Sequence, residues 1–303
     1  MFVVKYRKLF YLLSAILIIA SVWAISKWGL NPGIDFKGGS IVEVQYASST
    51  PPTQDVLTEA LLPLSLDASI RATGDDGYII RMRDISPEEK TNLTEVLGTF
   101  GTTTEKRFDS VGPLLGTEAL RKSLASIVLV ILAIVFFIAF AFRHVSEPIS
   151  SWKYGIIAVI ALVHDVIIPT GVFAILGHFK GYEVDTLFVT ALLVVLGFSV
   201  HDTIVVFDRV RENLKNALGK KPFDEIVGDS ISQTFTRSIN TSLTTLLALV
   251  VLYFVGGGST QHFALALIIG IVAGTYSSIF LGSPLLVTIW KWQENKKNKK
   301  GKK

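Results

Sequence analysis

Two aspartates stand inside apolar runs that are long enough to cross a membrane. Asp165 lies near the middle of AVIALVHDVIIPTGVFAIL, and Asp202 lies in LGFSVHDTIVVFDR, about a turn and a half before its run ends. An ionised carboxylate at the centre of a bilayer costs roughly 2.5 to 3.5 kcal/mol, and such groups usually face a bundle interior or a water-filled path. Each aspartate is therefore a candidate for binding and releasing a proton, with a structural hydrogen bond between helices as the alternative.

A cation beside a buried carboxylate would let it exchange a proton near neutral pH. Burial disfavours the ionised form of a carboxyl group, whereas a nearby positive charge favours it. Arg237, in SQTFTRSINTS, enters the fifth apolar run from the side at which Asp202 leaves the fourth, so the two can meet across adjacent helices. This spacing permits a pair between Asp202 and Arg237; the alternative is that Arg237 only extends to the membrane surface.

Each buried aspartate directly follows a histidine, His164 or His201. Adjacent side chains on a helix point about 100° apart, so we expect neither histidine to share a face with its aspartate. No HxxE or HxxxH spacing surrounds them and the chain has no cysteine, so neither a metal site nor a thiol nucleophile is predicted. His201 is a further proton-relay candidate, and packing between helices is the alternative for both histidines.

The elements that must hold these residues are membrane helices. The chain has 303 residues, 50% of them hydrophobic and 18% charged, with a mean hydropathy of +0.50, which is typical of several bilayer crossings. This composition predicts a polytopic α-helical membrane protein with six transmembrane helices. The expected crossings lie near residues 10–28, 124–142, 155–177, 186–207, 239–255 and 262–290.

Basic residues gather on one side of these crossings, which predicts cytoplasmic termini. The first run has no small-residue cleavage site after it, so we interpret it as a retained anchor. The net charge of +4 reflects this orientation rather than nucleic-acid binding. The basic residues on the expected cytoplasmic side are Lys5, Arg7, Lys8, Arg143, Lys153, Arg209, Arg211, Lys215, Lys220, Lys221, Arg237 and those of the tail.

The polar segment between the first two crossings predicts a small α+β domain outside the membrane. Its pattern is βαββαβ, the split ferredoxin-like order, with a hairpin turn at Gly74–Gly77 and a helix capped by Ser86. The domain offers a surface for polypeptide contact or is a passive extramembrane unit. The segments are, in order, GSIVEVQYA, PTQDVLTEALLPL, SIRATG, YIIRMRD, SPEEKTNLTEVLGTF and TTTEKRFDSVG.

The chain thus divides into four parts. We expect the cytoplasmic end and first crossing over residues 1–30, the α+β domain over 31–122, a five-helix bundle over 123–292 and a basic tail over 293–303. Gly270 and Gly274 form a GxxxG step, which predicts close packing between helices of the bundle.

Several long motifs closely resemble the SecF family, the six-crossing subunits of the SecDF protein-export complex. The similar stretches cover nearly the whole chain in the family's order. They are GIDFKGGS (33–40), VHDVIIPTGVFAILG (163–177), VLGFSVHDTIVVFDRVREN (195–213) and SISQTFTRSINTSLTTLLALVVLYFVGG (230–257).

The resemblance implies a non-enzymatic subunit, without a cofactor, of a proton-driven transporter of the resistance-nodulation-division superfamily in a bacterial inner membrane. It implies SecD as a separate partner chain that supplies another acidic residue, with SecYEG, YajC, the exported polypeptide and membrane lipid as further partners. Asp202 and Arg237 match the family's proton-passage residues, Asp165 matches its third-crossing aspartate, and His201 stands where the family commonly has Asn. The alternatives are a proton-coupled small-molecule efflux subunit and a membrane scaffold that couples to no ion.

Overall fold

The computed structural model describes residues 2–47, 51–142, 149–217 and 220–300, which form two compact units. One unit comprises Met1–Asn31 with Ala125–Lys303, and the other comprises Pro32–Leu124. Arg143 and the last two lysines of the basic tail lie outside the described residues.

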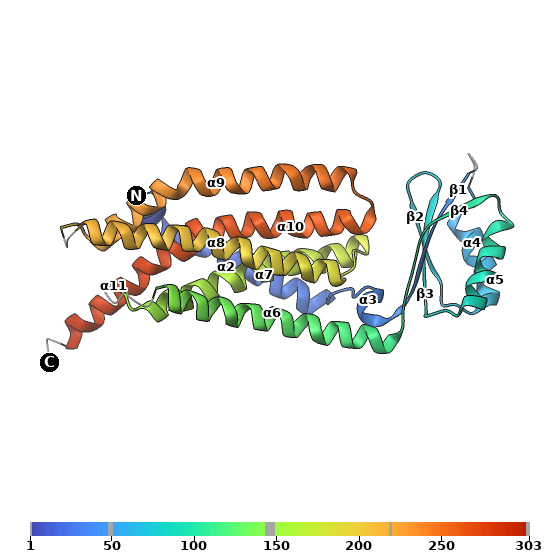
Figure 1. Ribbon diagram of the computed structural model, residues 1–303, viewed down its shortest axis with the longest axis horizontal. Helices are drawn as coiled ribbons and strands as arrows, with labels where there is room; N and C mark the ends of the chain where they lie inside the picture. Colours follow the sequence, from blue (N-terminus) through green and yellow to red (C-terminus); the bar gives the residue numbers. More distant parts are fainter. Residues whose placement is uncertain (1, 48–50, 143–148, 218–219, 301–303) are drawn as a thin grey trace. The chain divides into compact units, whose positions relative to one another are not determined.

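The first unit is a helical bundle (Figure 1). Among the described residues, six helical stretches are long and apolar enough to span a membrane, as the composition predicts. The last stretch combines two α-helices and the π-helical segment between them. The helices are α1 (Phe2–Lys5), α2 (Arg7–Trp28), α6 (Pro113–Ala141, which belongs to this unit from Ala125 onward), α7 (Ser151–Lys180), α8 (Thr186–Ala217), α9 (Phe223–Val255), α10 (Gly258–Tyr276), η2 (Ser277–Gly282, the π-helical segment) and α11 (Ser283–Lys300).

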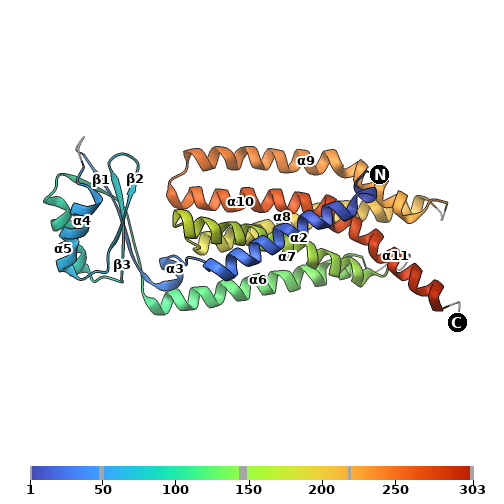
Figure 2. The same ribbon diagram turned by 180° about the vertical axis from the view of Figure 1, so that it is seen from behind.

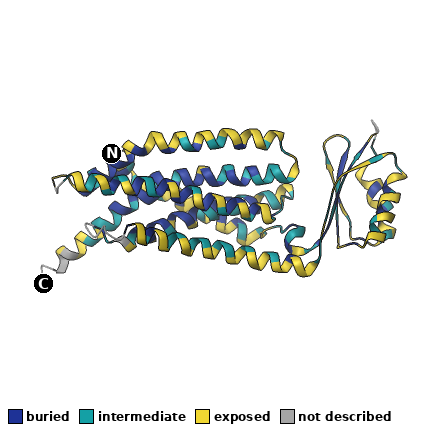
Figure 3. Cartoon of the chain, viewed as in Figure 1, coloured by how far each residue is buried: buried dark blue, intermediate teal, exposed yellow. Residues whose placement is uncertain are grey.

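Burial is uneven across the bundle. The apolar parts of α2, α6 and α9 are mostly exposed, whereas α7, α8 and the α10–α11 stretch bury half or more of theirs (Figure 3). Phe136 on α6 and Val251 on α9 are 74% and 62% exposed. Such side chains would face lipid or another chain, while the polar groups of interest lie among the buried helices.

Two helices extend further than the apolar runs predict. The fourth crossing, expected to end near residue 207, continues to Ala217, and the fifth begins at Phe223 rather than near residue 239. The added turns are polar, and their hydroxyls bond to carbonyls one turn earlier, as Ser230 Oγ does to Ile226 O at 2.7 Å. A hydropathy window ends at these polar residues, although neither added part contains a proline and α9 continues through Gly228.

The helix α10 packs closely on α8 at Gly270 and Gly274, the two glycines of the predicted GxxxG step. A Cβ added at Gly270 would lie 2.3 Å from a methyl of Val195, and one at Gly274 would lie 3.0 Å from Ser199 Cβ. A side chain at Gly270 would therefore push the two helices apart. This approach brings the middle of α8, with its polar residues, against the end of α10.

The second unit has the predicted βαββαβ order. Its four strands form an antiparallel sheet in the order β2-β3-β1-β4, and α4 and α5 cover one face of it (Figure 2). The short helices α3 (Ile34–Lys37) and η1 (Leu62–Leu64) are additional to the prediction. The other elements are β1 (Gly39–Tyr46), α4 (Gln54–Leu61), β2 (Ser69–Thr73), β3 (Gly77–Met82), α5 (Pro87–Gly98) and β4 (Thr103–Val111).

Alternation along the strands explains the core of this unit. Val42 and Val44 of β1 point to the helix-covered face and pack with Ile80, Leu57 and Leu93, each at most 3% exposed. The sheet and its two helices therefore bury a hydrophobic core of their own.

The entry to β1 requires two glycines. Gly38 and Gly39 have φ angles of +78° and +124°, values that residues other than glycine rarely adopt. A Cβ at Gly38 would lie 2.7 Å from Pro113 Cα, and one at Gly39 would lie 2.7 Å from Met82 O. Both conformation and space thus demand glycine at this pair.

Candidate proton-relay site

Asp165 lies at the centre of a hydrogen-bonded cluster inside the bundle. Its side chain on α7 is fully buried, and Oδ2 accepts from the hydroxyl of Ser277, in the π-helical segment, at 2.8 Å. The same oxygen accepts from the hydroxyl of Ser199 on α8. His164 Nδ1 lies 2.8 Å from Oδ1. Both carboxylate oxygens therefore have partners, and these come from three helical segments.

The contact between His164 and Asp165 contradicts the expectation that adjacent side chains would point apart. The backbone directions do diverge, but the imidazole turns along the helix so that Nδ1 reaches the neighbouring carboxylate. The ring also stacks on Tyr276, with 6.0 Å between ring centroids. His164 Nε2 is buried and has no hydrogen-bond partner within the described residues. His164 is therefore part of the Asp165 cluster.

Asp202 on α8 is only 3% exposed. Ser238 of α9 and Ser278 of the π-helical segment lie beside its carboxylate, and Arg237 of α9 is near enough for its charge to act on it. Despite these neighbours, Asp202 Oδ2 and Ser238 Oγ have no partner with hydrogen-bonding geometry in the described part of the chain. One oxygen of this carboxylate is thus buried and unpaired, in contrast to those of Asp165.

His201 is exposed on the bundle surface, while the adjacent Asp202 is buried. Here the helical spacing predicts the arrangement correctly. His201 therefore presents its ring to whatever surrounds this face of α8.

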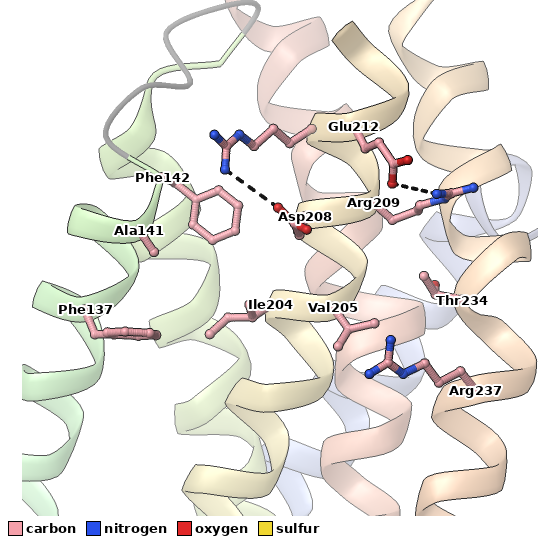
Figure 4. A pocket seen from close by; sticks show the side chains of 11 residues that line it. Phe137, Ala141, Phe142, Ile204, Val205, Asp208, Arg209, Glu212, Thr234 and Arg237 are labelled. Carbon is pink, nitrogen blue, oxygen red and sulfur yellow. Dashed lines mark hydrogen bonds and ion pairs between the residues drawn. The ribbon is translucent and has the colours of Figure 1, made fainter. Parts of the chain in front are cut away.

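Arg237 lies on α9 and lines a cavity of about 370 Å³ between α6, α8 and α9 (Figure 4). Its guanidinium is directed toward α8, near Val205. Between the described residues no direct ion pair joins Arg237 to Asp202, although the two are close enough for their charges to interact. The predicted pair is thus near but not in contact in this conformation.

Charged residues of α8 stand along the same cavity. Arg209 donates to Glu212 at 2.6 Å, and Arg211 lies 3.7 Å from Asp208 (Figure 4). Asp208 and Arg211 are three residues apart on α8, a spacing at which side chains of one helix can pair. These ion pairs give the cavity a polar rim, with the cation of Arg237 on its wall.

Sequence reasoning missed the serines. Ser199, Ser238, Ser277 and Ser278 are all buried and all lie beside one of the two carboxylates. Only Ser199 could have been placed near a buried carboxylate from the sequence. It precedes Asp202 by three residues and therefore lies near the same face of α8. For the other three, the sequence does not show which helix packs on which.

A six-helix membrane bundle with a βαββαβ domain after its first helix and two buried carboxylates defines a polytopic membrane protein of the transport type. The family model described as "Protein export membrane protein SecD/SecF, C-terminal" matches residues 92–292, and the SecD/SecF GG motif matches residues 23–50. This chain therefore belongs to the SecD/SecF family of protein export membrane proteins. The glycine pair at the start of β1 lies within the motif.

Curated relatives cover almost the whole chain. The protein translocase subunit SecF of Thermobaculum terrenum is 45% identical over 94% of this chain and 93% of its own length. The Synechocystis subunit SecF is 36% identical over 95% of this chain and 92% of its own. These relatives are named as translocase subunits, so the family role is in transport rather than in enzymatic catalysis.

Solved structures confirm the fold. The crystal structure of SecDF from Thermus thermophilus, described as a translocon-associated membrane protein, matches with a TM-score of 0.82 at 30% identity, over 95% of this chain. SecDF in a super-membrane-facing form matches with a TM-score of 0.66 at 30% identity, over 99% of this chain. This chain spans 38% and 39% of the lengths of those two chains.

Proposed function

We propose that this chain is a SecF-like subunit that pairs with SecD and uses the proton motive force to promote export of polypeptides through SecYEG. Its similarity to SecF relatives along their length, and to little more than a third of each SecDF chain, supports SecD as the partner. The proposal places the chain in a bacterial inner membrane with both termini in the cytoplasm. YajC and anionic lipid at the Lys-rich tail are further proposed partners.

The observation that carries the proton role is the unpaired oxygen of Asp202. Burying a polar atom without a partner costs free energy, so a buried carboxylate that retains one needs an explanation. Asp202 Oδ2 and Ser238 Oγ are both unpartnered within the described residues, yet the two side chains are neighbours. A protonated Asp202 could donate to Ser238 Oγ, and an ionised Asp202 could accept from the Ser238 hydroxyl. Release of the proton would also leave a charge that Arg237 attracts.

This exchange would change how α8 and α9 pack. With Asp202 neutral, Arg237 remains at the cavity wall; with Asp202 ionised, the guanidinium is drawn toward the buried carboxylate. The cavity between α6, α8 and α9 gives the arginine room for that movement. We propose that the extramembrane domain follows the changed packing and acts on the exported chain.

The test is the completion of a trapped, half-exported polypeptide in vesicles that contain this chain and SecD, with and without a proton gradient. We expect Asp202→Asn to abolish the acceleration by the gradient while the complex still assembles. Glu294→Gln is the control, since it removes an exposed carboxylate of α11 that does not line the cavity. A gradient effect that survives Asp202→Asn in the assembled complex would overturn the proposal.

A further inference from the structure

The helix that closes the bundle changes direction beside the two carboxylates. Between α10 and α11 the chain passes through the π-helical segment Ser277–Gly282, and α11 runs at an angle to α10 (Figures 1 and 2). Pro284 is the second residue of α11 and lacks the N–H that would bond back to residue 280. A wide turn next to a proline is a recognised cause of helix bending, and π segments often occur at functional positions.

The hydroxyl of Ser277 has two acceptors for its single hydrogen. Its Oγ lies 2.8 Å from Asp165 Oδ2 on α7 and 3.1 Å from Gly274 O in its own helix. A serine hydroxyl donates one hydrogen bond at a time but can accept others. The hydrogen can therefore lie on the carboxylate or on the carbonyl.

Ser278 stands near the other carboxylate but, within the described residues, has no hydrogen bond to it; the π-helical segment that carries Ser278 packs against α8. The Oγ of Ser278 lies 3.0 Å from Thr275 O in its own helix, and its side chain lies beside Asp202 of α8. Consecutive residues of a helix point in different directions, so one segment can reach α7 with one serine and α8 with the next. The π-helical segment is thus a shared neighbour of both buried carboxylates.

We propose that Ser277 and Ser278 are positioning residues that transmit the protonation state of Asp165 and Asp202 to the backbone of the π-helical segment. When a carboxylate is ionised, the serine hydroxyl donates to it. When the carboxylate takes up a proton, it donates to the serine oxygen, and the serine hydrogen turns to the helix carbonyl of Gly274 or Thr275. The Asp202 half of this mechanism rests on the proposed function.

A hydroxyl that donates to its own helix competes with the backbone hydrogen bonds and often bends the helix. The bend between α10 and α11 should consequently depend on the protonation of the carboxylates. α11 is bound to the start of α9, because Lys291 Nζ lies 2.8 Å from Asp224 Oδ2 and Trp290 packs on Phe223. A change of bend would therefore move the α9 end that lies two or more turns before Arg237.

Other ionisable groups lie near the two carboxylates and can affect their protonation. His164 from α7 and Tyr276 from α10 lie at the Asp165 end, and His201 from α8 and Arg237 from α9 lie at the Asp202 end. α2 contributes the carbonyl of Phe10, to which the Tyr276 hydroxyl donates at 2.8 Å. The variants must therefore be compared at matched pH with these groups unchanged.

The experiment is infrared spectroscopy of the carboxylic-acid band against pH, on this chain with SecD in lipid, without a gradient. Asp165→Asn and Asp202→Asn identify the two contributions. We expect Ser277→Ala to move the midpoint of the Asp165 band by about one pH unit to higher pH, since the ionised form loses a donor. Ser278→Ala should do the same to the Asp202 band, and threonine at either position should restore the native midpoint.

Ser283→Ala is the matched control. Ser283 is also fully buried on the same helix, but its hydroxyl donates to the carbonyl of Ser278 at 2.7 Å. We expect it to move neither band. Equal shifts in all three alanine variants, no shift in any, or the absence of a band assigned to Asp165 at every pH would overturn the inference.

A second measurement does not depend on the serine variants folding. The chain has no cysteine, so spin labels can be placed at Val272 on α10 and Trp292 on α11, both more than half exposed. We expect the distance between the labels to change between high and low pH in the native background. An unchanged distance would overturn the link to bending. Band shifts without gradient-dependent export would leave this inference standing and remove the proposed function.

Discussion

The two buried carboxylates are chemically similar but differently surrounded. Asp165 has partners on both oxygens, whereas Asp202 retains an oxygen with none among the described residues. A carboxylate with partners on both oxygens is held in one geometry. A carboxylate with an unpaired oxygen is stabilised by any hydrogen-bond donor that reaches it. At the scale of single residues, this difference favours Asp202 as the group that gains a new partner, whereas a change at Asp165 would reverse hydrogen bonds that it already has.

One ion pair in the extramembrane domain gives a pH prediction. The guanidinium of Arg83 donates to Glu89, and the backbone N–H of Ser86 adds a second bond, so the pKa of Glu89 falls from its ordinary 4.5 to about 2. Because the folded-state pKa is depressed, the charge of Glu89 stabilises the domain fully above pH 4.5. This stabilisation is lost as the pH falls toward 2.

We therefore predict that Glu89→Gln lowers the thermal unfolding midpoint of the domain at neutral pH and that the difference from the native protein vanishes near pH 2. Glutamine keeps the capping-box contact with Ser86, so only the charge is removed. The measurement is circular dichroism of the purified protein over this pH range. Glu88→Gln removes the same charge one residue away; if its pH profile matches that of Glu89→Gln, the ion pair is not the cause.

At the scale of elements, the contact between α8 and α10 holds the polar residues in place. We predict that Gly270→Ala destabilises the bundle by about 1 to 3 kcal/mol, because its Cβ would lie 2.3 Å from a Val195 methyl. Val195→Ala in the same chain should recover most of the loss by making room. Chemical unfolding of the protein in detergent measures both variants.

Gly155→Ala is the control for this prediction. Gly155 is a buried glycine of α7, but an added Cβ would stand 3.9 Å from its nearest neighbour, Val135 O, which is ordinary contact. Alanine there should be neutral or slightly stabilising, since it favours the helix. If Gly155→Ala lowered the stability as much as Gly270→Ala, the loss would be common to glycines in these helices and would not depend on the contact with Val195.

How much the sequence predicted differs between the elements. The strands, the hairpin at Gly74–Gly77 and the cap at Ser86 follow from local chemistry, and the structure confirms each of them. The polar ends of α8 and α9 were missed because hydropathy locates the apolar residues that span a membrane. It does not show where a helix continues through polar residues. The cluster of Asp165 with Ser199 and Ser277 depends on packing between distant segments, which single-sequence patterns do not contain.

At the scale of the whole molecule, the basic residues predict which side of the membrane each loop faces. The absence of cysteine makes the test direct, because a single introduced thiol has no background. Thr104 in β4 and Gly257 between α9 and α10 are exposed positions expected outside the cytoplasm. Lys220, before α9, and Lys296 on α11 are exposed positions expected in the cytoplasm.

We predict that a membrane-impermeant maleimide added to intact spheroplasts labels Thr104→Cys and Gly257→Cys, and that Lys220→Cys and Lys296→Cys react only after the membrane is opened. The reason is the energetic cost of moving lysine-rich loops across the membrane, which orients short loops by their positive charge. Labelling after detergent treatment is the control for thiol reactivity. The reverse pattern would invert the bundle and place the Arg237 cavity near the opposite face of the membrane, which would contradict the proposed orientation.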